Sequence, residues 1–525
     1  MRFLAPLAIA VLGVGLFSTA SGQEFDLVIR RGRILDGAGA PAVAGDVAIR
    51  GNRIAAVGRV EGKGRTEIDA RGQIVAPGFI DVHTHSEDIL ELAVAENFLR
   101  MGVTTIVTGN CGGSKTDIAG FFADLERTRV AVNVATLIGQ GSVRGQVMGG
   151  SFMRPPTPEE MDRMRALVAQ AMKEGAVGIS TGLIYLPGTF TKTEELIELS
   201  KVAAAHGGMY VSHMRAETAK IFDALAELIR IAREARIPAQ VSHIKLSSPS
   251  AWGRADEVIA LLDRARAEGL VINQDQYVYT ASSTGIATLV PTEAREGGVK
   301  EFRDRLADPA KKAAIIAEMK HTIQVGKRGD YGYAVIASYP KNKALNGKSV
   351  REAAQILRGS TSIDDQIEVI LDITANGGAQ GVFHGMNEAD LQKFLVLPQT
   401  MIASDAGPRR FGNAVPHPRG YGNNARVLGR YVRELKLLRL EEAVRKMTSL
   451  PARTFHLANR GEIRPGFVAD LAIFDPDKVS DPSTFDDPHH YAIGFSDVIV
   501  NGVPVIHDSQ LTDARPGRPV RRTDS

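Results

Sequence analysis

Apolar and polar positions alternate along most of the chain in blocks of two kinds. Short apolar runs are typical of buried strands, and between them lie longer stretches with apolar residues at helical spacing, such as 158–173 and 218–235. Eight such runs end at Thr84, Thr108, Gly139, Thr181, His213, His243, Gln276 and Ser404. Because strands that alternate with helices form parallel sheets, the pattern predicts an α/β fold with a TIM-like (β/α)8 barrel over residues 76–457.

The two ends of the chain show a different pattern, with short β-rich runs separated by glycine turns. Residues 23–75 contain such runs at 26–29, 33–35, 46–49 and 53–57. The same texture returns in residues 458–525, at 469–474 and 497–506. We therefore expect both ends to build one small β-sandwich domain beside the barrel.

One stretch interrupts the barrel pattern. Residues 286–350 are charged and contain glycine, and they form a connection too long for an ordinary loop between a strand and a helix. A helix is predicted around residues 310–320. We interpret this stretch as an inserted lid or subdomain. A further apolar run at 380–384 is an alternative barrel strand, which leaves the strand count open by one.

Composition narrows the class of protein. The chain has 525 residues, of which 44% are hydrophobic and 23% charged, so a folded globular protein is expected and a disordered chain is not. Lysine and arginine number 63 against 60 aspartate and glutamate, with no long basic run interleaved with aromatics, so nucleic acid is not an expected partner. A short arginine-rich stretch, 515–522, is interpreted as a solvated tail.

Residues 1–22 have the composition of a secretory signal peptide. Met1-Arg2 gives a positive start, residues 3–17 are apolar without a charge, and small residues at 18–22 allow cleavage. This run is shorter than the about 20 residues that cross a bilayer, so a membrane anchor is not expected. We expect export to the periplasm or the medium. In an exported chain the single cysteine, Cys111, has no disulfide partner and is an apolar filler, a reactive thiol or a metal ligand.

Several potential metal ligands stand at the ends of predicted barrel strands. His83 and His85 are two residues apart on the first strand, so their side chains point to the same side. His213, His243 and Asp405 end later strands. Barrel enzymes place their reactive groups at this edge of the sheet.

Cys111 follows the second strand within a glycine-rich turn, where backbone can approach a ligand closely. Four histidines, one carboxylate and one thiol can hold one or two divalent ions, and this mixture of nitrogen, sulfur and oxygen is typical of zinc.

These residues give the chain a resemblance to the amidohydrolase superfamily, carried by residues 76–85 with His83 and His85 and by the closing motif at 466–473. Within it, the chain resembles the N-acyl-D-amino-acid deacylases, or D-aminoacylases. The motifs that carry this closer resemblance are Gly109-Asn-Cys-Gly112 and the stretches 174–185, 212–217, 242–245 and 404–419.

The resemblance implies a tightly held zinc ion at Cys111, His213 and His243 and a weaker second site at His83, His85 and Asp405. It also implies that the substrate carboxylate binds to cationic and hydroxyl side chains, namely Arg419, Lys245, Tyr185, one of Tyr277 and Tyr279, and Ser283. The fourth strand, which ends at Thr181, has no lysine, and this argues against the carboxylated lysine of hydantoinase-like amidohydrolases.

The expected reaction is hydrolysis of an N-acyl-D-amino acid to a carboxylate and a free D-amino acid, with Asp405 as the general base and acid. A dipeptidase for peptides with a C-terminal D-residue, a cyclic-amide hydrolase and, as a different class, a non-catalytic binding module are the alternatives. The chain departs from the family pattern at Gln140, Val278 and residues 291–294. We expect these positions to line the side-chain or acyl pocket.

Overall fold

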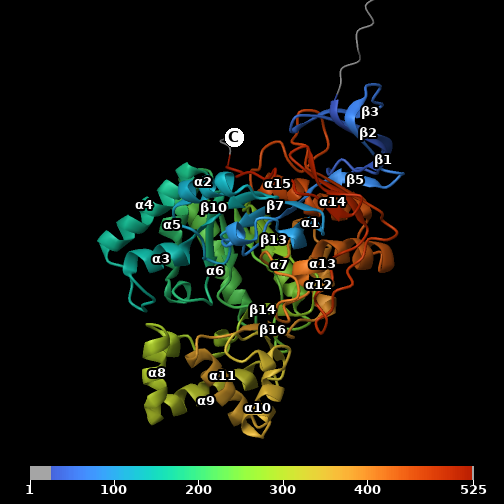
Figure 1. Cartoon of the computed structure of the whole chain (residues 1–525). Coiled ribbons are helices and arrows are strands. Elements are labelled where there is room, and N and C mark those ends of the chain that lie inside the picture. Colours follow the sequence, from blue (N-terminus) through green and yellow to red (C-terminus); the bar gives the residue numbers. More distant parts are fainter. Residues whose placement is uncertain (1–24, 523–525) are drawn as a thin grey trace, which may run out of the picture.

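A barrel of parallel strands forms the centre of the computed structural model, which describes residues 25–522 (Figure 1). The predicted leader at residues 1–22 lies outside the described residues. Each strand is short and fully or almost fully buried. The barrel strands are β6 (Phe79–Asp81), β7 (Val103–Thr108), β8 (Asn133–Thr136) with β9 (Ile138–Gly139), β10 (Gly178–Gly182), β11 (Met209–His213), β12 (Ala239–Val241), β13 (Ile272–Gln276) and β17 (Thr400–Ile402).

All the pairs between neighbouring barrel strands are parallel. β8 and β9 are consecutive pieces of one strand, and the Val177 amide donates to the Thr136 carbonyl across 2.9 Å, which links them to β10. A parallel bridge between Thr84 and Ala406 joins the first strand to the last. The strands therefore close into the predicted eight-membered barrel.

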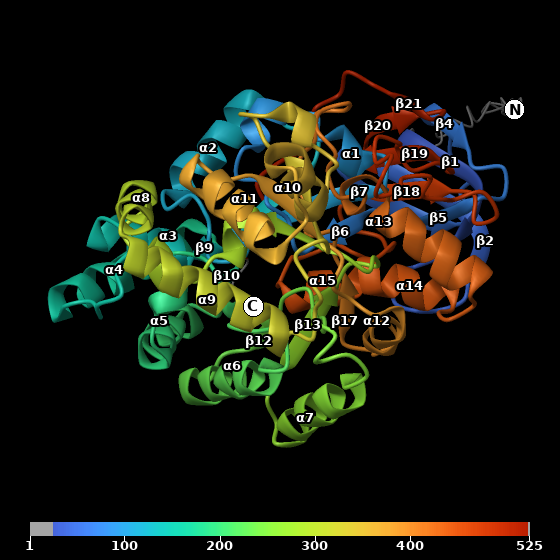
Figure 2. The ribbon, with the colours of Figure 1, turned by 90° about the horizontal axis from the view of Figure 1, so that it is seen from below.

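Amphipathic helices cover the outside of the barrel (Figure 2). α4 begins with a capping box of Thr157 and Glu160 and ends at Gly175 in the left-handed conformation, which explains why this stretch forms a helix with defined ends. The helices outside the insertion are α1 (Glu96–Leu99), α2 (Ile118–Thr128), α3 (Gln140–Met148), α4 (Pro158–Glu174), α5 (Thr193–Ala205), α6 (Ile221–Ala235), α7 (Ala255–Ala267), α12 (Glu388–Leu395), α13 (Arg419–Arg426), α14 (Leu440–Met447) and α15 (Ser449–Thr454).

Both ends of the chain contribute to one β-domain beside the barrel. Antiparallel pairing of β5 with β18 joins the two ends, and β1 pairs with β2, β4 and β5, so that strands from both ends form one nine-stranded sheet with a common apolar core. Its strands are β1 (Phe25–Ile34), β2 (Val43–Arg50), β3 (Arg53–Gly58), β4 (Gly64–Asp69), β5 (Ile74–Pro77), β18 (Leu471–Phe474), β19 (Phe495–Val500), β20 (Val503–His507) and β21 (Gln510–Leu511).

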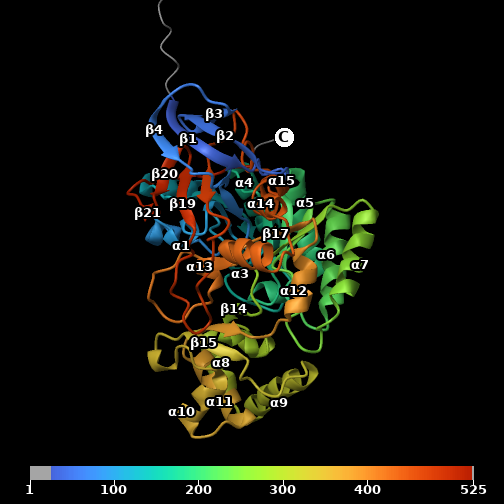
Figure 3. The same ribbon diagram turned by 90° about the vertical axis from the view of Figure 1, so that its right-hand side faces the viewer.

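The insertion is a subdomain with its own apolar core, and it lies against the mouth of the barrel (Figure 3). It is larger than the predicted 286–350, because antiparallel pairing of β16 with β14 and β15 extends it to Phe383. The run at 380–384 is therefore not a barrel strand. The elements are β14 (Ser282–Gly285), α8 (Val299–Ala307), α9 (Pro309–Val325), β15 (Ala334–Ser338), α10 (Val350–Arg358), α11 (Ile363–Ala375) and β16 (Gln380–Phe383).

The arginine-rich end of the chain is ordered against the barrel, which corrects its interpretation as a solvated tail. The Val134 amide donates to the Arg518 carbonyl across 3.0 Å, and the Val520 amide donates to the Val134 carbonyl across 2.8 Å. Val520 is buried with apolar residues of the barrel interior, including Ile80 and Met209. This segment lies at the end of the barrel opposite the insertion.

Candidate metal centre and active site

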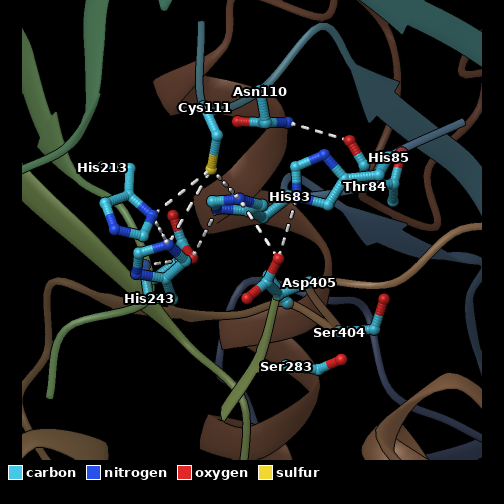
Figure 4. A network of polar contacts seen from close by, with 12 residues as sticks. His83, Thr84, His85, Asn110, Cys111, His213, His243, Ser283, Ser404 and Asp405 are labelled. Atoms are coloured by element: carbon cyan, nitrogen blue, oxygen red, sulfur yellow. Dashed lines mark hydrogen bonds and ion pairs between the residues drawn. The ribbon is translucent and has the colours of Figure 1, made fainter. Parts of the chain in front are cut away.

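The six predicted metal ligands meet at the carboxyl ends of the barrel strands (Figure 4). His83 and His85 follow β6, and Cys111 follows β7. His213 is the last residue of β11, His243 lies two residues beyond β12, and Asp405 follows β17. Residues far apart in the sequence converge because parallel strands all end at the same edge of the barrel.

Cys111 stands beside three imidazole rings. Its Sγ lies 3.3 Å from Nε2 of His83 and 3.7 Å from Nδ1 of His213. The third ring, His243, has its Nε2 at 3.9 Å from the same Sγ and at 2.8 Å from Nδ1 of His213. Cys111, His83 and His243 form one group whose donor atoms are close enough together to hold a metal ion.

Asp405 completes a second group with His83 and His85. Its Oδ1 lies 3.0 Å from Nε2 of His85 and 3.6 Å from Nε2 of His83. His83 thus faces both Cys111 and Asp405, and the two groups share one ring. Thiol, imidazole and carboxylate donors that converge in this way fit one or two divalent cations of the zinc type.

The backbone is unusual at three of these residues. Cys111, His243 and Asp405 have φ values of 52°, 34° and 51°, in the left-handed region that residues other than glycine seldom adopt. After Cys111 the chain also passes close to β10, since a Cβ on Gly112 would lie only 2.8 Å from the Gly182 amide nitrogen. Backbone held in such conformations is concentrated at functional sites, where it aims side chains that regular structure would direct elsewhere.

The electrostatics of the cluster favour the anionic forms of Cys111 and Asp405. Burial alone would raise the pKa of the Cys111 thiol, but His83 and the two other facing histidines hold this pKa well below its ordinary value. Burial would likewise raise the pKa of Asp405, and Arg419 together with His83 lowers it well below the ordinary value. Thiolate and carboxylate are the forms that bind a metal.

Asp275, which was not predicted from the sequence, lies behind two of the histidines. Its Oδ1 is 3.2 Å from Nδ1 of His83 and accepts a hydrogen bond of 2.8 Å from the backbone amide of His243. A carboxylate on the outer nitrogen of an imidazole fixes the orientation of the ring. Asp275 lies at the carboxyl end of β13. Asp405 was predicted as a ligand because it ends a barrel strand, and the same signal could have found Asp275.

Glu217 is the second missed residue, and it lies beside both His243 and Lys245. Its Oε1 accepts a hydrogen bond of 2.5 Å from Nζ of Lys245 and lies 3.0 Å from Nδ1 of His243. Glu217 closes the motif at 212–217, which is the signal in the sequence that could have found it. Its donor atom also lies close enough to His213 and His243 to form a third potential ligand group.

A cavity of about 200 Å³ extends from the cluster to the insertion. Tyr185, Lys245 and Ser283, predicted to bind substrate, all line it. Tyr185 packs against the His213 ring at a centroid distance of 5.0 Å.

Arg419 reaches the cluster from α13. Its Nη1 lies 2.9 Å from Oδ2 of Asp405, and its Nε is buried without a hydrogen-bond partner in the part of the chain that the structure describes. Tyr277 lies under the Arg419 guanidinium, 4.5 Å from ring centroid to guanidinium carbon. Tyr279 does not join them, because its hydroxyl donates to Asp481. Of the two tyrosines left open by the sequence, the structure brings only Tyr277 to the cluster.

The positions where the chain departs from the family pattern do not line this cavity. Gln140 is buried and donates to Thr191 and Glu195. Val278 is buried too, and residues 291–293 line a neighbouring hollow that shares Leu289 and Thr322 with the cavity. The expectation that these positions line the side-chain or acyl pocket therefore stays a prediction. The cavity is lined by the insertion instead, through residues such as Leu289, Ile323 and Phe383.

Comparison with known proteins agrees with this architecture. The amidohydrolase family model Amidohydro_3 matches residues 66–506. D-aminoacylase of Alcaligenes xylosoxydans xylosoxydans is 36% identical, with 96% of this chain and 99% of that protein covered. N-acyl-D-glutamate deacylase of the same organism is 35% identical, with 96% and 98% covered.

A solved structure, N-acyl-D-glutamate deacylase of Bordetella bronchiseptica with zinc and a phosphonate inhibitor, matches with a TM-score of 0.82. It is 32% identical, and the match covers 95% of this chain and all of that one. The chain therefore belongs to the amidohydrolase family, in its group of N-acyl-D-amino-acid deacylases. Membership of this family makes the protein a hydrolase of amide bonds.

Replacement of Glu217 by glutamine is expected to weaken metal binding by about 10–100-fold, the usual effect of losing a partner behind a ligand. The change removes the negative charge that faces His243 and leaves Lys245 without its ion pair. Competition with a chromophoric chelator measures the affinity. Glu234→Gln, an exposed change on α6, is the control. Equal affinities in the two variants would contradict a positioning role for Glu217.

Proposed function

We propose that the protein is a zinc-dependent hydrolase that splits N-acyl-D-amino acids into a carboxylate and a free D-amino acid. The observation that carries this proposal is the convergence of six donor groups at one end of the barrel, three of which, His213, His243 and Asp405, line a cavity together with Lys245. The donor set of thiol, imidazole and carboxylate supports zinc, and the similar Bordetella enzyme is described with zinc.

Asp405 is the residue that we propose moves the proton. Zinc held by Cys111, His213 and His243 would polarise the amide carbonyl and lower the pKa of water. The Asp405 carboxylate, ionised at neutral pH, takes the proton from the attacking water and later delivers it to the departing amine. His85 and Arg419 hold this carboxylate in place from either side.

The substrate's α-carboxylate requires cations fixed near the metal, and Arg419 and Lys245 both lie beside the cluster. Arg419 has a buried Nε with no hydrogen-bond partner among the described residues, and Lys245 lines the cavity beside His243. Ser283 and Tyr185 line the same cavity and offer hydroxyl groups to the substrate. Charge-assisted hydrogen bonds from these groups would hold the carboxylate in one orientation.

The relatives differ in the substrates that their names give. Identities of 36% with a D-aminoacylase and 35% with an N-acyl-D-glutamate deacylase do not choose between neutral and acidic amino acids for this chain. The residues that line the cavity must therefore determine whether neutral or acidic substrates are preferred.

We also propose that the protein is exported, on the basis of the signal-peptide pattern of residues 1–22. Among the described residues, no helix is both long and apolar enough to cross a membrane.

Hydrolysis of matched N-acetyl-D- and N-acetyl-L-amino acids tests the proposed function. The panel includes leucine, glutamine and glutamate, a dipeptide with a C-terminal D-residue, and a hydantoin, and release of amine is followed by chromatography. We expect D-selective release from the N-acetyl compounds. Selective cleavage of the dipeptide or of the hydantoin would show that the protein is a dipeptidase or a cyclic-amide hydrolase instead. Preference for L-substrates would contradict the proposal.

A further inference from the structure

A cation on the insertion faces the same cavity as the metal cluster. Arg328 follows α9 and lines the cavity together with His213, His243 and Asp405. It therefore belongs to the wall that the insertion contributes, whereas Lys245 belongs to the barrel.

Arg328 is held firmly in this position. Its Nη2 donates a hydrogen bond of 2.6 Å to the Ser247 carbonyl, and its guanidinium carbon lies 3.6 Å from the centroid of the Tyr333 ring. Gly385 permits the first contact, because a Cβ there would come within 2.7 Å of both Arg328 Nη2 and the Ser247 oxygen. A side chain fixed by a hydrogen bond and by stacking loses little further freedom when a ligand binds.

The charge of Arg328 has no anionic partner among residues 25–522. Its hydrogen bond to the Ser247 carbonyl and its stacking on the Tyr333 ring both involve uncharged groups. The other cation that lines the cavity, Lys245, is paired with Glu217 at 2.5 Å, and Arg419 at the cluster is paired with Asp405 at 2.9 Å.

Burial lowers the pKa of Arg328, with a small opposing effect of Tyr333, as expected for a guanidinium that has lost part of its water without gaining a carboxylate. The guanidinium nevertheless stays charged in proteins. A partly buried, unpaired charge is costly, and an incoming anion removes that cost.

We propose that Arg328 binds a second carboxylate of the substrate, so that the enzyme favours N-acyl-D-amino acids that carry an anionic group besides the α-carboxylate. This inference rests on the proposed function. The second carboxylate belongs either to an acidic side chain, as in D-glutamate, or to a dicarboxylic acyl group. In both cases the guanidinium forms two parallel hydrogen bonds with it, which a neutral amide of the same shape does not allow.

Two pairs of substrates that differ only in one charge test the inference. The first pair is N-acetyl-D-glutamate and N-acetyl-D-glutamine, and the second is N-succinyl-D-leucine and its succinamoyl analogue. We expect kcat/KM for the acid to exceed that for the amide by about tenfold or more in one pair, since hydrogen bonds between charged groups are worth about 1.4 kcal/mol or more. The pair that shows the preference identifies the source of the carboxylate.

Substitution of the arginine then assigns the effect to one residue. In Arg328→Met the acid-to-amide ratio is expected to fall to about one, and Arg328→Lys is expected to keep a reduced preference because it keeps the charge. Arg303→Met, a matched change at an exposed arginine of α8, should leave the ratio unaltered.

A ratio near one in both pairs for the unmodified enzyme would overturn the inference while D-selective hydrolysis still supports the proposed function. A preference that persists in Arg328→Met would also overturn it. Absence of hydrolysis with every substrate would overturn both the inference and the proposed function.

Discussion

Replacement of Cys111 by serine is expected to remove the tightly held metal and to lower kcat/KM by more than about 100-fold. Loss of a residue that only orients a metal ligand costs up to about 100-fold, and loss of the ligand itself should cost more. Serine has nearly the size of cysteine, but its hydroxyl stays protonated at neutral pH and therefore does not replace the thiolate. The three imidazoles that face Sγ would then lose the one anionic donor that they share. Metal content by mass spectrometry and kcat/KM on the same preparation give the two readouts.

The control for this substitution lies in the same loop. Lys115→Ala changes an exposed residue four positions along and should retain both metal and activity. A cooperative unfolding transition in Cys111→Ser would show that the loss arises from the site and not from the fold. Retention of stoichiometric metal and of normal turnover in Cys111→Ser would contradict the assignment of Cys111 as a ligand.

Replacement of Asp405 by asparagine is expected to lower kcat by about 10²–10⁴-fold, the range for removal of a general acid or base. Asparagine has almost the same shape but neither accepts nor delivers a proton at neutral pH. The group that contains Cys111 does not include Asp405, so metal should remain bound there. Steady-state kinetics and metal content on the same protein separate the proton-transfer role from a purely structural one.

A matched control for this variant is Asp364→Asn, at an exposed position of α11. It removes the same charge far from the cluster and should leave kcat unaltered. Normal kcat in Asp405→Asn with metal bound would show that another group moves the proton.

The sequence predicted the barrel well because each strand carries a local signal. An apolar run followed by a polar residue marks the carboxyl end of a strand, and the fold then brings these ends together. That is why His213 and Asp405 were placed correctly at one edge although neither has a neighbouring ligand in the sequence. The six donors were found because their chemistry and their position at strand ends coincide.

The insertion shows where local patterns fail. Residues 380–383 have the same apolar texture as a barrel strand, and only their pairing partners distinguish them. Those partners lie far away in the sequence, so neither the extent of the insertion nor the identity of β16 follows from periodicity. The buried end of the chain is similar, because Val520 is buried by the end of the barrel opposite the insertion and not by its own sequence neighbours.

Two other details depended on side-chain direction. Tyr277 and Tyr279 are two residues apart just beyond β13, where the chain is no longer a regular strand, so alternation does not predict which ring faces the metals. The structure turns Tyr277 toward Arg419 and Tyr279 toward Asp481. The contacts of Glu217 with His243 and Lys245 likewise become visible only once the strands are in register.

The most direct test of a metal-dependent amide hydrolase is the return of activity when zinc is added to metal-free protein. Hydrolysis of the best N-acetyl-D-amino acid in the panel is measured at increasing ratios of zinc to chain. The site predicts no turnover without metal and a rise that levels off at about one zinc per chain, as expected for one tightly held catalytic ion. Full activity in the metal-free protein would contradict the account.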